Sequence, residues 1–362
     1  MTTTSAAMTS TAAAKPAVRA GYMPQLDGVR GLAILAVVAW HFEPWSSQIM
    51  PWGQIGVRLF FVLGCFLVTS ALLRARDRVA AGTLSVGTAA KAFYLGRHMR
   101  LIPMYWLTLI VVAALGYPSV RDNFFWHFFF ATNLFIGFTK QFPPDSAHFW
   151  FLGAQEQIYL VWPWLILALR RRALLCVILA CIVEAPLYRL VMMHVDPYFW
   201  YFASPFANLD SIACGALLAW LRHDKSDTTL ARLTGPGTGW IALALFAFGC
   251  TRAQWAMFPG PITETGMSLA FAWFVARTSI GFKGIGETVL ATWPLRGTGA
   301  VSYGLYVFHP LVAPGLLALG IYGPNDTYAR LILATAASYA LAVASYYLIE
   351  KPIANFKRAR RG

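Results

Sequence analysis

Eleven long apolar stretches constrain the fold of this chain more than any other feature. Short polar or charged segments separate them, and a helix needs about 20 apolar residues to cross the hydrocarbon core of a bilayer. The pattern therefore predicts an all-α, polytopic membrane protein. The stretches cover residues 29–49, 54–73, 95–115, 123–138, 148–169, 173–192, 205–222, 237–255, 264–281, 299–320 and 328–349.

The composition excludes an ordinary soluble enzyme and also a disordered or fibrous chain. Of the 362 residues, 58% are hydrophobic and only 12% are charged, whereas soluble domains average about a quarter charged residues. The formal net charge is +14, but most of the excess lies between the apolar stretches and in the tails. The positive-inside rule explains this placement better than nucleic-acid binding does. We therefore expect membrane lipids, and no nucleic acid, as partners.

The charge pattern also decides the expected placement of 123–138, the shortest stretch. If this stretch does not cross the membrane, basic clusters such as 74–78 and 170–172 fall on the same side. If it does cross, the bias is lost from Arg170 onward. The sequence therefore predicts about ten transmembrane helices, with a re-entrant or interfacial segment near 123–138 and both termini in the cytoplasm.

The two ends of the chain differ from the rest in composition. Residues 1–20 are rich in Thr, Ala and Ser and contain no apolar core of the signal-peptide type, so we expect a disordered cytoplasmic tail. Residues 353–362 are predicted to form a basic cytoplasmic tail. Residues 21–352 form the predicted transmembrane domain.

The first apolar stretch carries Arg30 and, eleven residues later, His41. In a helix these two side chains share one face and lie about 17 Å apart along the axis. An ionisable side chain so deep in a membrane is costly unless it faces protein or water. We therefore predict a functional role for His41; the alternative is a histidine hydrogen-bonded within the helix packing.

Arg97 and Arg100 lie three residues apart at the expected cytoplasmic start of the third span. Two arginines near a helix start oppose the helix dipole, and guanidinium groups match phosphate oxygens in geometry. We expect these residues, together with Arg30, to bind an anionic cosubstrate. The alternative is ordinary anchoring at the positively charged side of the membrane.

Three further ionisable residues lie inside or near the ends of apolar stretches. Glu156 lies about two turns inside its stretch and is predicted to be functional; the alternative is a structural ion pair with an arginine. Arg58 and Asp210 lie near the outer ends of two other stretches and are candidate substrate contacts. Their alternatives are a snorkelling arginine and a helix cap.

Tyr306 and His309 lie on one face of the tenth stretch, together with Ser302. His309 is expected about 15 Å from the cytoplasmic end, a depth similar to that expected for His41 and Glu156. Three ionisable groups in one layer indicate a reaction site, and we expect Tyr306 and His309 to contact the substrate.

The sequence lacks the motifs of several common chemistries. It contains no GxSxG elbow, P-loop, HExxH motif or CxxC pair, and no GxGxxG following a strand pattern. We therefore expect no bound metal.

Seven segments, in this order, resemble the acyltransferase-3 family of bacterial integral-membrane O-acyltransferases. The resemblance covers about residues 25–352, nearly the whole chain. Since the chain ends at Gly362, we expect the form without the periplasmic esterase-like domain that some members carry. The segments read LDGVRGLAIL…H, GVRLFFVLGCFL, GRHMRLIPMYW, QEQIYLVWP, NLDSIACGALLA, VSYGLYVFHPLV and IEKP.

This resemblance implies roles for the residues that match the family motifs. Arg30 and His41 match the family's Arg-x10-His, whose histidine is regarded as catalytic. Arg97 and Arg100 match its Arg-x-x-Arg, which is linked to the acyl donor. Glu156 matches the acid of its Glu-Gln-x-Tyr motif and is expected to be the second catalytic residue, which orients an imidazole or holds the sugar.

The chain departs from the family pattern at two places. Gly64-Cys65 stands where Ser-Gly is usual, and Gln155 stands where a first acid is common. These departures leave no support for a serine hydroxyl or a second carboxylate at those positions.

The resemblance also implies the reaction. Acetyl-CoA or another acyl-CoA would be the cosubstrate, with acetyl as the expected group. A sugar hydroxyl of a surface polysaccharide or lipid-linked glycan would be the acceptor. The protein would be a multi-pass acyltransferase of the bacterial inner membrane. His41 would either deprotonate the acceptor hydroxyl or carry the acyl group briefly.

Three alternatives remain open at this point. The acceptor is instead a macrolide or another small hydroxylated product, or the chain is a transporter or flippase for a glycan or lipid. The third is a heparan-type transmembrane acetyltransferase, which the motifs favour less. Consumption of an acyl-CoA thioester separates the enzymes from the transporter.

Overall fold

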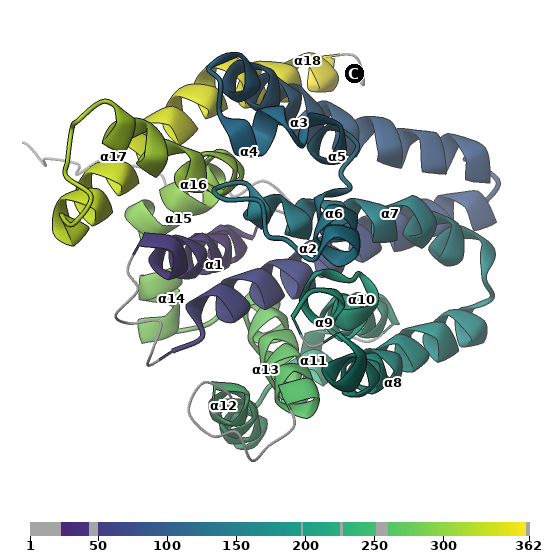
Figure 1. Cartoon of the computed structure of the whole chain (residues 1–362). Helices are drawn as coiled ribbons and strands as arrows, with labels where there is room; N and C mark the ends of the chain where they lie inside the picture. The colour runs from purple at the N-terminus through teal and green to yellow at the C-terminus, as the bar shows by residue number, and fades with distance from the viewer. Residues whose placement is uncertain (1–22, 43–49, 197, 225–226, 251–259, 360–362) are drawn as a thin grey trace, which may run out of the picture.

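The computed structural model describes residues 23–42, 50–196, 198–224, 227–250 and 260–359. Over these residues the chain forms helices joined by turns, without a β-strand (Figure 1). This finding confirms the all-α class predicted from the apolar stretches. The predicted tail at residues 1–20 lies outside the described ranges.

Within the described ranges, one long helix covers most of each predicted stretch other than 123–138. The sequence forms helices there because runs of apolar residues are interrupted by few helix breakers, and the prolines within them are accommodated. The long helices are α1 (Pro24–Phe42), α2 (Trp52–Ala80), α3 (Val86–Ala114), α7 (Trp150–Ala168), α8 (Arg171–Val195), α10 (Leu209–Asp224), α12 (Pro236–Cys250), α13 (Gly260–Ile280), α16 (Ser302–Ala318) and α17 (Thr327–Ser345).

Length and hydropathy alone qualify three helical segments of the described chain as membrane spans. These are Trp52–Ala80, Arg171–Val195 and Thr327–Phe356. A fourth is added if Trp293–Ala300 and Ser302–Ala318, which meet at an angle of 75°, are counted as one bent span. This finding agrees with a membrane protein, and the count of about ten crossings stays a prediction.

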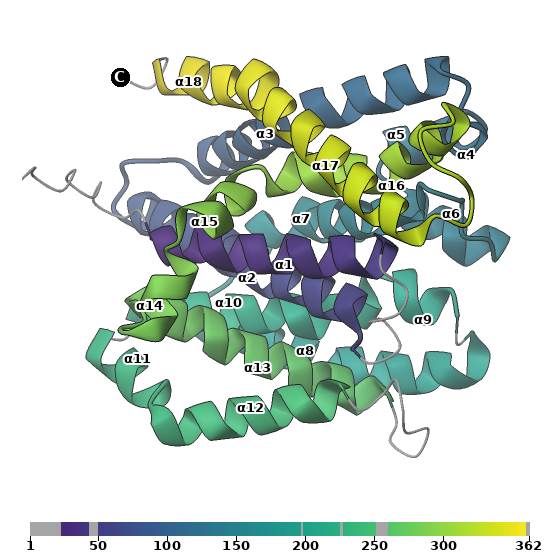
Figure 2. The same ribbon diagram turned by 90° about the vertical axis from the view of Figure 1, so that its left-hand side faces the viewer.

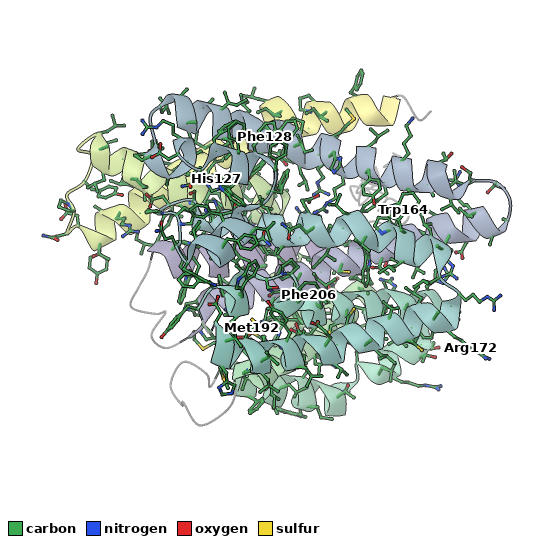
Figure 3. All side chains as sticks on the ribbon, turned by 45° about the vertical axis from the view of Figure 1, so that its right-hand side comes forward. His127, Phe128, Trp164, Arg172, Met192 and Phe206 are labelled. Carbon is green, nitrogen blue, oxygen red and sulfur yellow. The ribbon has the colours of Figure 1, made fainter. Side chains whose placement is uncertain are left out.

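Short helices gather at the two ends of the bundle. Figure 2 shows α11, α14, α15 and α18 toward one end, and α4, α5, α6 and α9 toward the other. Figure 3 shows Arg172 and Trp164 toward the first end, and His127 and Met192 toward the second. The short helices are α4 (Pro118–Arg121), α5 (Phe124–Phe128), α6 (Thr132–Thr139), α9 (Trp200–Ala203), α11 (Asp227–Leu233), α14 (Ile285–Leu290), α15 (Trp293–Ala300) and α18 (Lys351–Ala359).

Segment 123–138 does not form a single long helix. It forms α5 and then α6, with 5 and 8 residues, or about 8 and 12 Å of helix. Phe130, which lies between them, has a φ of 54°, a left-handed conformation that interrupts a helix. Neither piece is long enough to cross a bilayer alone. The re-entrant or interfacial placement of this segment stays a prediction.

The C-terminal segment is more ordered than a tail. A π-helical turn at Tyr346–Glu350 continues α17, and α18 then extends through Ala359. Most of the predicted basic tail, 353–362, is therefore helical.

Helix α1 lies between α2 on one side and α15 and α16 on the other (Figure 2). Small residues allow these close contacts. A Cβ atom at Gly56 of α2 would lie 2.6 Å from the carbonyl oxygen of Ala33, and one at Gly299 of α15 would lie 1.8 Å from that of Asp27. This packing brings the charged face of α1 against α16 and sets the position of the candidate site.

Candidate functional site

Two cavities meet at the side chain of Tyr306. The first, of about 390 Å³, is lined by Arg30, Arg97 and Arg100 among others, and we call it the arginine cavity. The second, of about 610 Å³, is lined by His41 among others, and we call it the histidine cavity. Among the residues that the structure describes, Tyr306 is the one that borders both. Of the residues singled out from the sequence, the arginine cavity therefore contains Arg30, Arg97 and Arg100, and the histidine cavity contains His41.

Arg97 is held firmly within the arginine cavity. Its Nε donates a hydrogen bond of 2.8 Å to Glu156 Oε1, and its Nη2 donates one of 3.0 Å to Gln155 Oε1. The guanidinium also lies 4.1 Å above the ring of Tyr159. These contacts join α3 to α7, and they use much of the donor capacity of Arg97.

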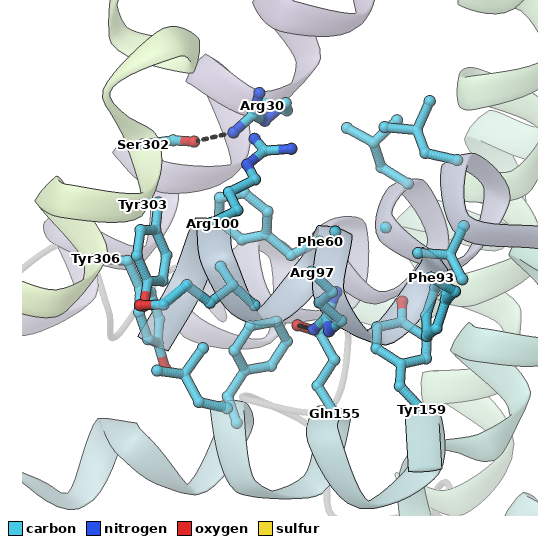
Figure 4. A pocket seen from close by; sticks show the side chains of 18 of the residues that line it. Arg30, Phe60, Phe93, Arg97, Arg100, Gln155, Tyr159, Ser302, Tyr303 and Tyr306 are labelled. Carbon is cyan, nitrogen blue, oxygen red and sulfur yellow. Dashed lines mark hydrogen bonds between the residues drawn. The ribbon is translucent and has the colours of Figure 1, made fainter. Parts of the chain in front are cut away.

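The side chain of Arg100 points toward Arg30 within the arginine cavity (Figure 4). Arg30 donates a hydrogen bond of 3.1 Å to Ser302 Oγ and lies 3.5 Å from an Asp27 oxygen. Arg100 is exposed and makes no hydrogen bond or ion pair within the described ranges. Two guanidinium groups with spare donors in one cavity favour an anion between them.

His41 contacts His309 at the start of the histidine cavity. His41 Nδ1 lies 2.9 Å from the carbonyl oxygen of Val37 and 3.2 Å from His309 Nε2. The two ring centroids are 4.7 Å apart in an edge-to-face arrangement. Arg30 and His41 thus share one face of α1, as their spacing predicts, and the structure places this face against α16.

The sequence around His309 fixes the orientation of its ring. Pro310 lacks a backbone N–H, so the carbonyl of Tyr306 has no helical donor. His309 Nδ1 lies 2.9 Å from that carbonyl oxygen and 3.0 Å from the one of Leu305. Carbonyl oxygens only accept hydrogen bonds, so Nδ1 of His309 carries a proton, and in the neutral ring Nε2 is a bare acceptor.

The same argument gives the proton position in His41. Its Nδ1 faces two acceptors, the Val37 carbonyl oxygen and the bare Nε2 of His309, so Nδ1 carries the proton. Nε2 of neutral His41 is then unprotonated. This nitrogen is the atom of His41 that is available for acid–base or nucleophilic chemistry.

His148 is a third histidine in this cluster, and the sequence analysis did not single it out. Its ring centroid lies 5.5 Å from that of His309 and 6.4 Å from that of His41. Its Nε2 lies 3.3 Å from the Val307 carbonyl oxygen, while its Nδ1 is buried without a hydrogen-bond partner in the described chain. The HFWF segment that precedes the Glu156 motif was the available signal.

Glu156 does not lie with the histidines. It lies about two turns inside α7, whereas His148 lies in the 3₁₀ turn Ala147–Phe149 that precedes this helix, and the contacts of Glu156 are with Arg97. The expectation of one layer that unites His41, His309 and Glu156 is therefore met for the two histidines only. The carboxylate helps to hold the arginine cavity instead.

Arg58 and Asp210 belong to a buried ion network rather than to a cavity wall. Arg58 donates a hydrogen bond of 3.3 Å to Asp210 Oδ1, and Arg189 donates one of 2.7 Å to Asp210 Oδ2. Glu264 pairs with both arginines. Tyr201, which lines the histidine cavity, donates to Glu264. The network joins α2, α8, α10 and α13 and contains two cations and two anions.

Tyr306 and His309 differ in their access to substrate. Tyr306 borders both cavities and donates a hydrogen bond to the carbonyl oxygen of His148. His309 is completely buried, with 0% of its surface exposed, and lines neither cavity. Within the described ranges, no group of three or more His, Cys, Asp or Glu side chains is arranged to hold a metal ion.

The sequence matches a known family and several curated proteins. Residues 23–349 match the family model described as an acyltransferase domain. The chain is 26% identical to the peptidoglycan O-acetyltransferase OatA of Listeria monocytogenes, over 92% of this chain and 56% of that protein. It is 27% identical to the putative peptidoglycan O-acetyltransferase YrhL of Bacillus subtilis, over 92% and 55%.

A third relative is similar in extent. The O-acetyltransferase OatA of Staphylococcus aureus is 26% identical, over 92% of this chain and 57% of that protein. The chain therefore spans about half the length of the curated relatives it matches. No solved structure matches it significantly.

Proposed function

Because this chain belongs to the acyltransferase family whose model covers residues 23–349, we propose that it transfers an acetyl group from acetyl-CoA to a glycan hydroxyl. The observation that carries this proposal is the meeting of the arginine and histidine cavities at Tyr306. One cavity offers groups that bind an anion, and the other offers a base. An acyl transfer between an anionic donor and a neutral alcohol needs both.

The arginine cavity suits the donor. Acyl-CoA carries several phosphate charges, and the side chain of Arg100 points toward Arg30 there (Figure 4). Arg97 is held by Glu156 and contributes positive charge from a fixed position. Charge-assisted hydrogen bonds from guanidinium to phosphate are among the stronger ones in proteins. The thioester end would then extend toward Tyr306.

The histidine cavity suits the acceptor. Its wall is rich in aromatic side chains, with Trp40, Trp150, Tyr198 and Phe202 among them. Apolar walls with a few placed polar groups are typical of small-molecule sites. The names of the relatives include peptidoglycan O-acetyltransferases, which favours a sugar of a surface polysaccharide or lipid-linked glycan over a macrolide.

His41 would act as the general base. Its bare Nε2 takes the proton from the acceptor hydroxyl while that oxygen attacks the thioester carbon. The carbon–sulfur bond breaks, the ester forms, and the proton passes to the departing CoA thiolate. The same nitrogen is also the atom that would form a covalent acyl-histidine, so the chemical test below distinguishes the two routes.

The arrangement also supports a direction across the membrane. Arg30 lies near the N-terminal end of α1, on the side where positively charged segments accumulate in the sequence. Donor would enter there from the cytoplasm, and acceptor from the opposite side. We propose this direction for a chain that crosses a bacterial inner membrane ten times and has both termini in the cytoplasm.

The test uses the purified chain in lipid nanodiscs with acetyl-CoA labelled in the acetyl group. Soluble peptidoglycan glycan strands, a macrolide and buffer alone are compared as acceptors. We expect thioester consumption and base-labile ester on the glycan strands. A transporter would leave the thioester intact, and no consumption with any acceptor would refute the proposal. Label retained on protein that is denatured rapidly at neutral pH, where an acyl-histidine survives longer than in acid, would indicate the covalent route.

A further inference from the structure

His309 has the properties of a residue that acts through another side chain. It is fully buried and lines neither cavity, so a substrate in either cavity does not reach it. Both of its ring nitrogens already have partners: Nδ1 faces two carbonyl oxygens, and Nε2 faces His41. The contact with substrate expected from the sequence therefore does not agree with this geometry.

We propose that His309 is a positioning residue for His41. Its bare Nε2 accepts the proton of His41 Nδ1 and so holds the imidazole with Nε2 toward the histidine cavity. The expected effects on kcat and KM rest on the proposed function. The hydrogen bond itself is a property of the free protein.

The two acceptors of His41 are not equivalent. The Val37 carbonyl is part of α1 and is four residues before His41, so it is shared with the helical N–H of His41 itself. Nε2 of His309 has no other donor among the described residues. When His41 gains a proton it becomes a cation, and a hydrogen bond to the unshared lone pair of His309 strengthens.

The local sequence explains why His309 can serve in this way. Pro310 releases the carbonyl of Tyr306, and two carbonyl oxygens then hold the proton on Nδ1 of His309. A neutral histidine locked in this tautomer presents a lone pair at Nε2. Many enzymes hold a nucleophile, a base and a third group that orients the base. Here the base is His41, and the neutral ring of His309 is the third group.

The test compares three variants of His309. The amide of Gln extends to the position of Nε2 and can offer an oxygen to His41, whereas the shorter amide of Asn reaches only the position of Nδ1. We expect His309→Gln to retain activity within about fivefold of wild type and His309→Asn to lose about tenfold or more in kcat, as fits the loss of one hydrogen bond. His309→Leu should behave like His309→Asn.

The KM for acetyl-CoA should stay unchanged in all three variants, because His309 does not touch the arginine cavity. A double variant, His41→Ala with His309→Asn, should be no worse than His41→Ala, since a positioning residue has nothing left to position. Additive losses, or equal losses for the Gln and Asn variants at matched thermal stability, would overturn the inference.

His127→Gln supplies a matched control. His127 is also fully buried, its ring nitrogens bond to Thr132 and to the Ser119 carbonyl, and it lines neither cavity. We expect this variant to lower thermal stability while kcat per folded molecule stays near wild type. An equal loss of kcat there would mean that buried histidines matter only for packing.

A second measurement separates this inference from the proposed function. In protein labelled with ¹⁵N at the histidine rings, the His41 signals are identified by their loss in His41→Ala. We expect the proton on Nδ1 of His41 in protein measured without acetyl-CoA and without a glycan acceptor. A proton on Nε2 instead would overturn the inference even if acyl transfer were observed, and a proton on Nδ1 without any acyl transfer would leave only the proposed function refuted.

Discussion

Glu156 holds Arg97 in an ion pair that joins α3 to α7, whereas Arg100, three residues further along α3, has no ion pair or hydrogen bond among the described residues. The arginines that look equivalent in the sequence therefore have different tasks. Arg97 is part of the cavity wall, and Arg100 is free to bind a ligand.

Replacing Arg100 with Ala should weaken acetyl-CoA binding while leaving the protein as stable as wild type. The lost charge-assisted contact is worth about 1.5–3 kcal/mol, or roughly 10- to 150-fold in affinity. Arg97→Ala should weaken binding and also lower the unfolding temperature, because Glu156 loses its partner. Binding is measured by calorimetry and unfolding by intrinsic fluorescence. Equal effects of both variants on stability would contradict this division.

His41→Ala should remove acyl transfer and leave insertion and thermal stability nearly intact. Loss of a general base costs roughly 10²–10⁴-fold in rate. The measurement is acetyl transfer by purified, monodisperse protein, compared with wild type. Activity within about tenfold of wild type, below the general-base range, would refute the assignment of His41 as the base.

The buried network of Arg58, Asp210, Arg189 and Glu264 should matter for stability rather than for substrate binding. Asp210→Asn leaves buried arginine charge without its carboxylate, a change that typically costs about 3–5 kcal/mol. We expect a clear fall in unfolding temperature with normal activity in the folded fraction. Asp122→Asn, which breaks the exposed pair with Arg121, should change stability little. Lost activity at unchanged unfolding temperature would support substrate contact instead.

Acid should affect the contact between Lys140 and Asp196 only well below neutral pH. Burial alone would raise the pKa of Asp196, but hydrogen bonds from Lys140 and the backbone of Phe199 hold this pKa below its usual value. The contribution to stability is therefore complete above the pKa of an unfolded aspartate, about 3.9, and is lost as pH falls through the lower folded value.

The check compares thermal unfolding of wild type and Asp196→Asn as a function of pH. We expect a constant difference between pH 5 and 8 that begins to fall below about pH 4 and vanishes only at pH values below the folded pKa of Asp196. A difference that changes between pH 5 and 8 would show that another group titrates with this contact.

The predicted orientation is tested with single cysteines in a chain whose native cysteines are replaced by serine. A cysteine at Arg172, which lies at one end of the bundle (Figure 3), should react with a membrane-impermeant thiol reagent only after cells are opened. A cysteine at Gln141, which follows α6, should react in intact cells. The reverse pattern would overturn the ten-span arrangement.

The sequence predicts relations along one helix well and relations between helices poorly. Arg30 and His41 lie on one face of α1 because helical periodicity alone sets that relation. The partner of Glu156 is 59 residues away in the chain and the partner of Arg58 in α13 is 206 residues away. No local pattern encodes which distant charge neutralises a buried one, so the network remained invisible in the sequence.

His148 illustrates a different kind of omission. It lies in a 3₁₀ turn, Ala147–Phe149, before α7, where no periodic pattern assigns a side chain to a face. Only the docking of that turn against α16, through the Val307 carbonyl oxygen and Tyr306, brings its ring near His41. Packing between elements decides such a placement, and periodicity does not.

The position of Tyr306 has a consequence for the energetics of the living cell. If the two cavities open to opposite compartments, the side chain of Tyr306 is part of the barrier between them, and each proton that leaks through this barrier dissipates about 2.3 kcal/mol per 100 mV of membrane potential. Shortening that side chain would join the cavities into one water-filled path. Cells that express Tyr306→Ala should then depolarise and grow slowly even where acetylation is dispensable. The ring of Tyr306 would thus block proton leakage as well as line the two cavities.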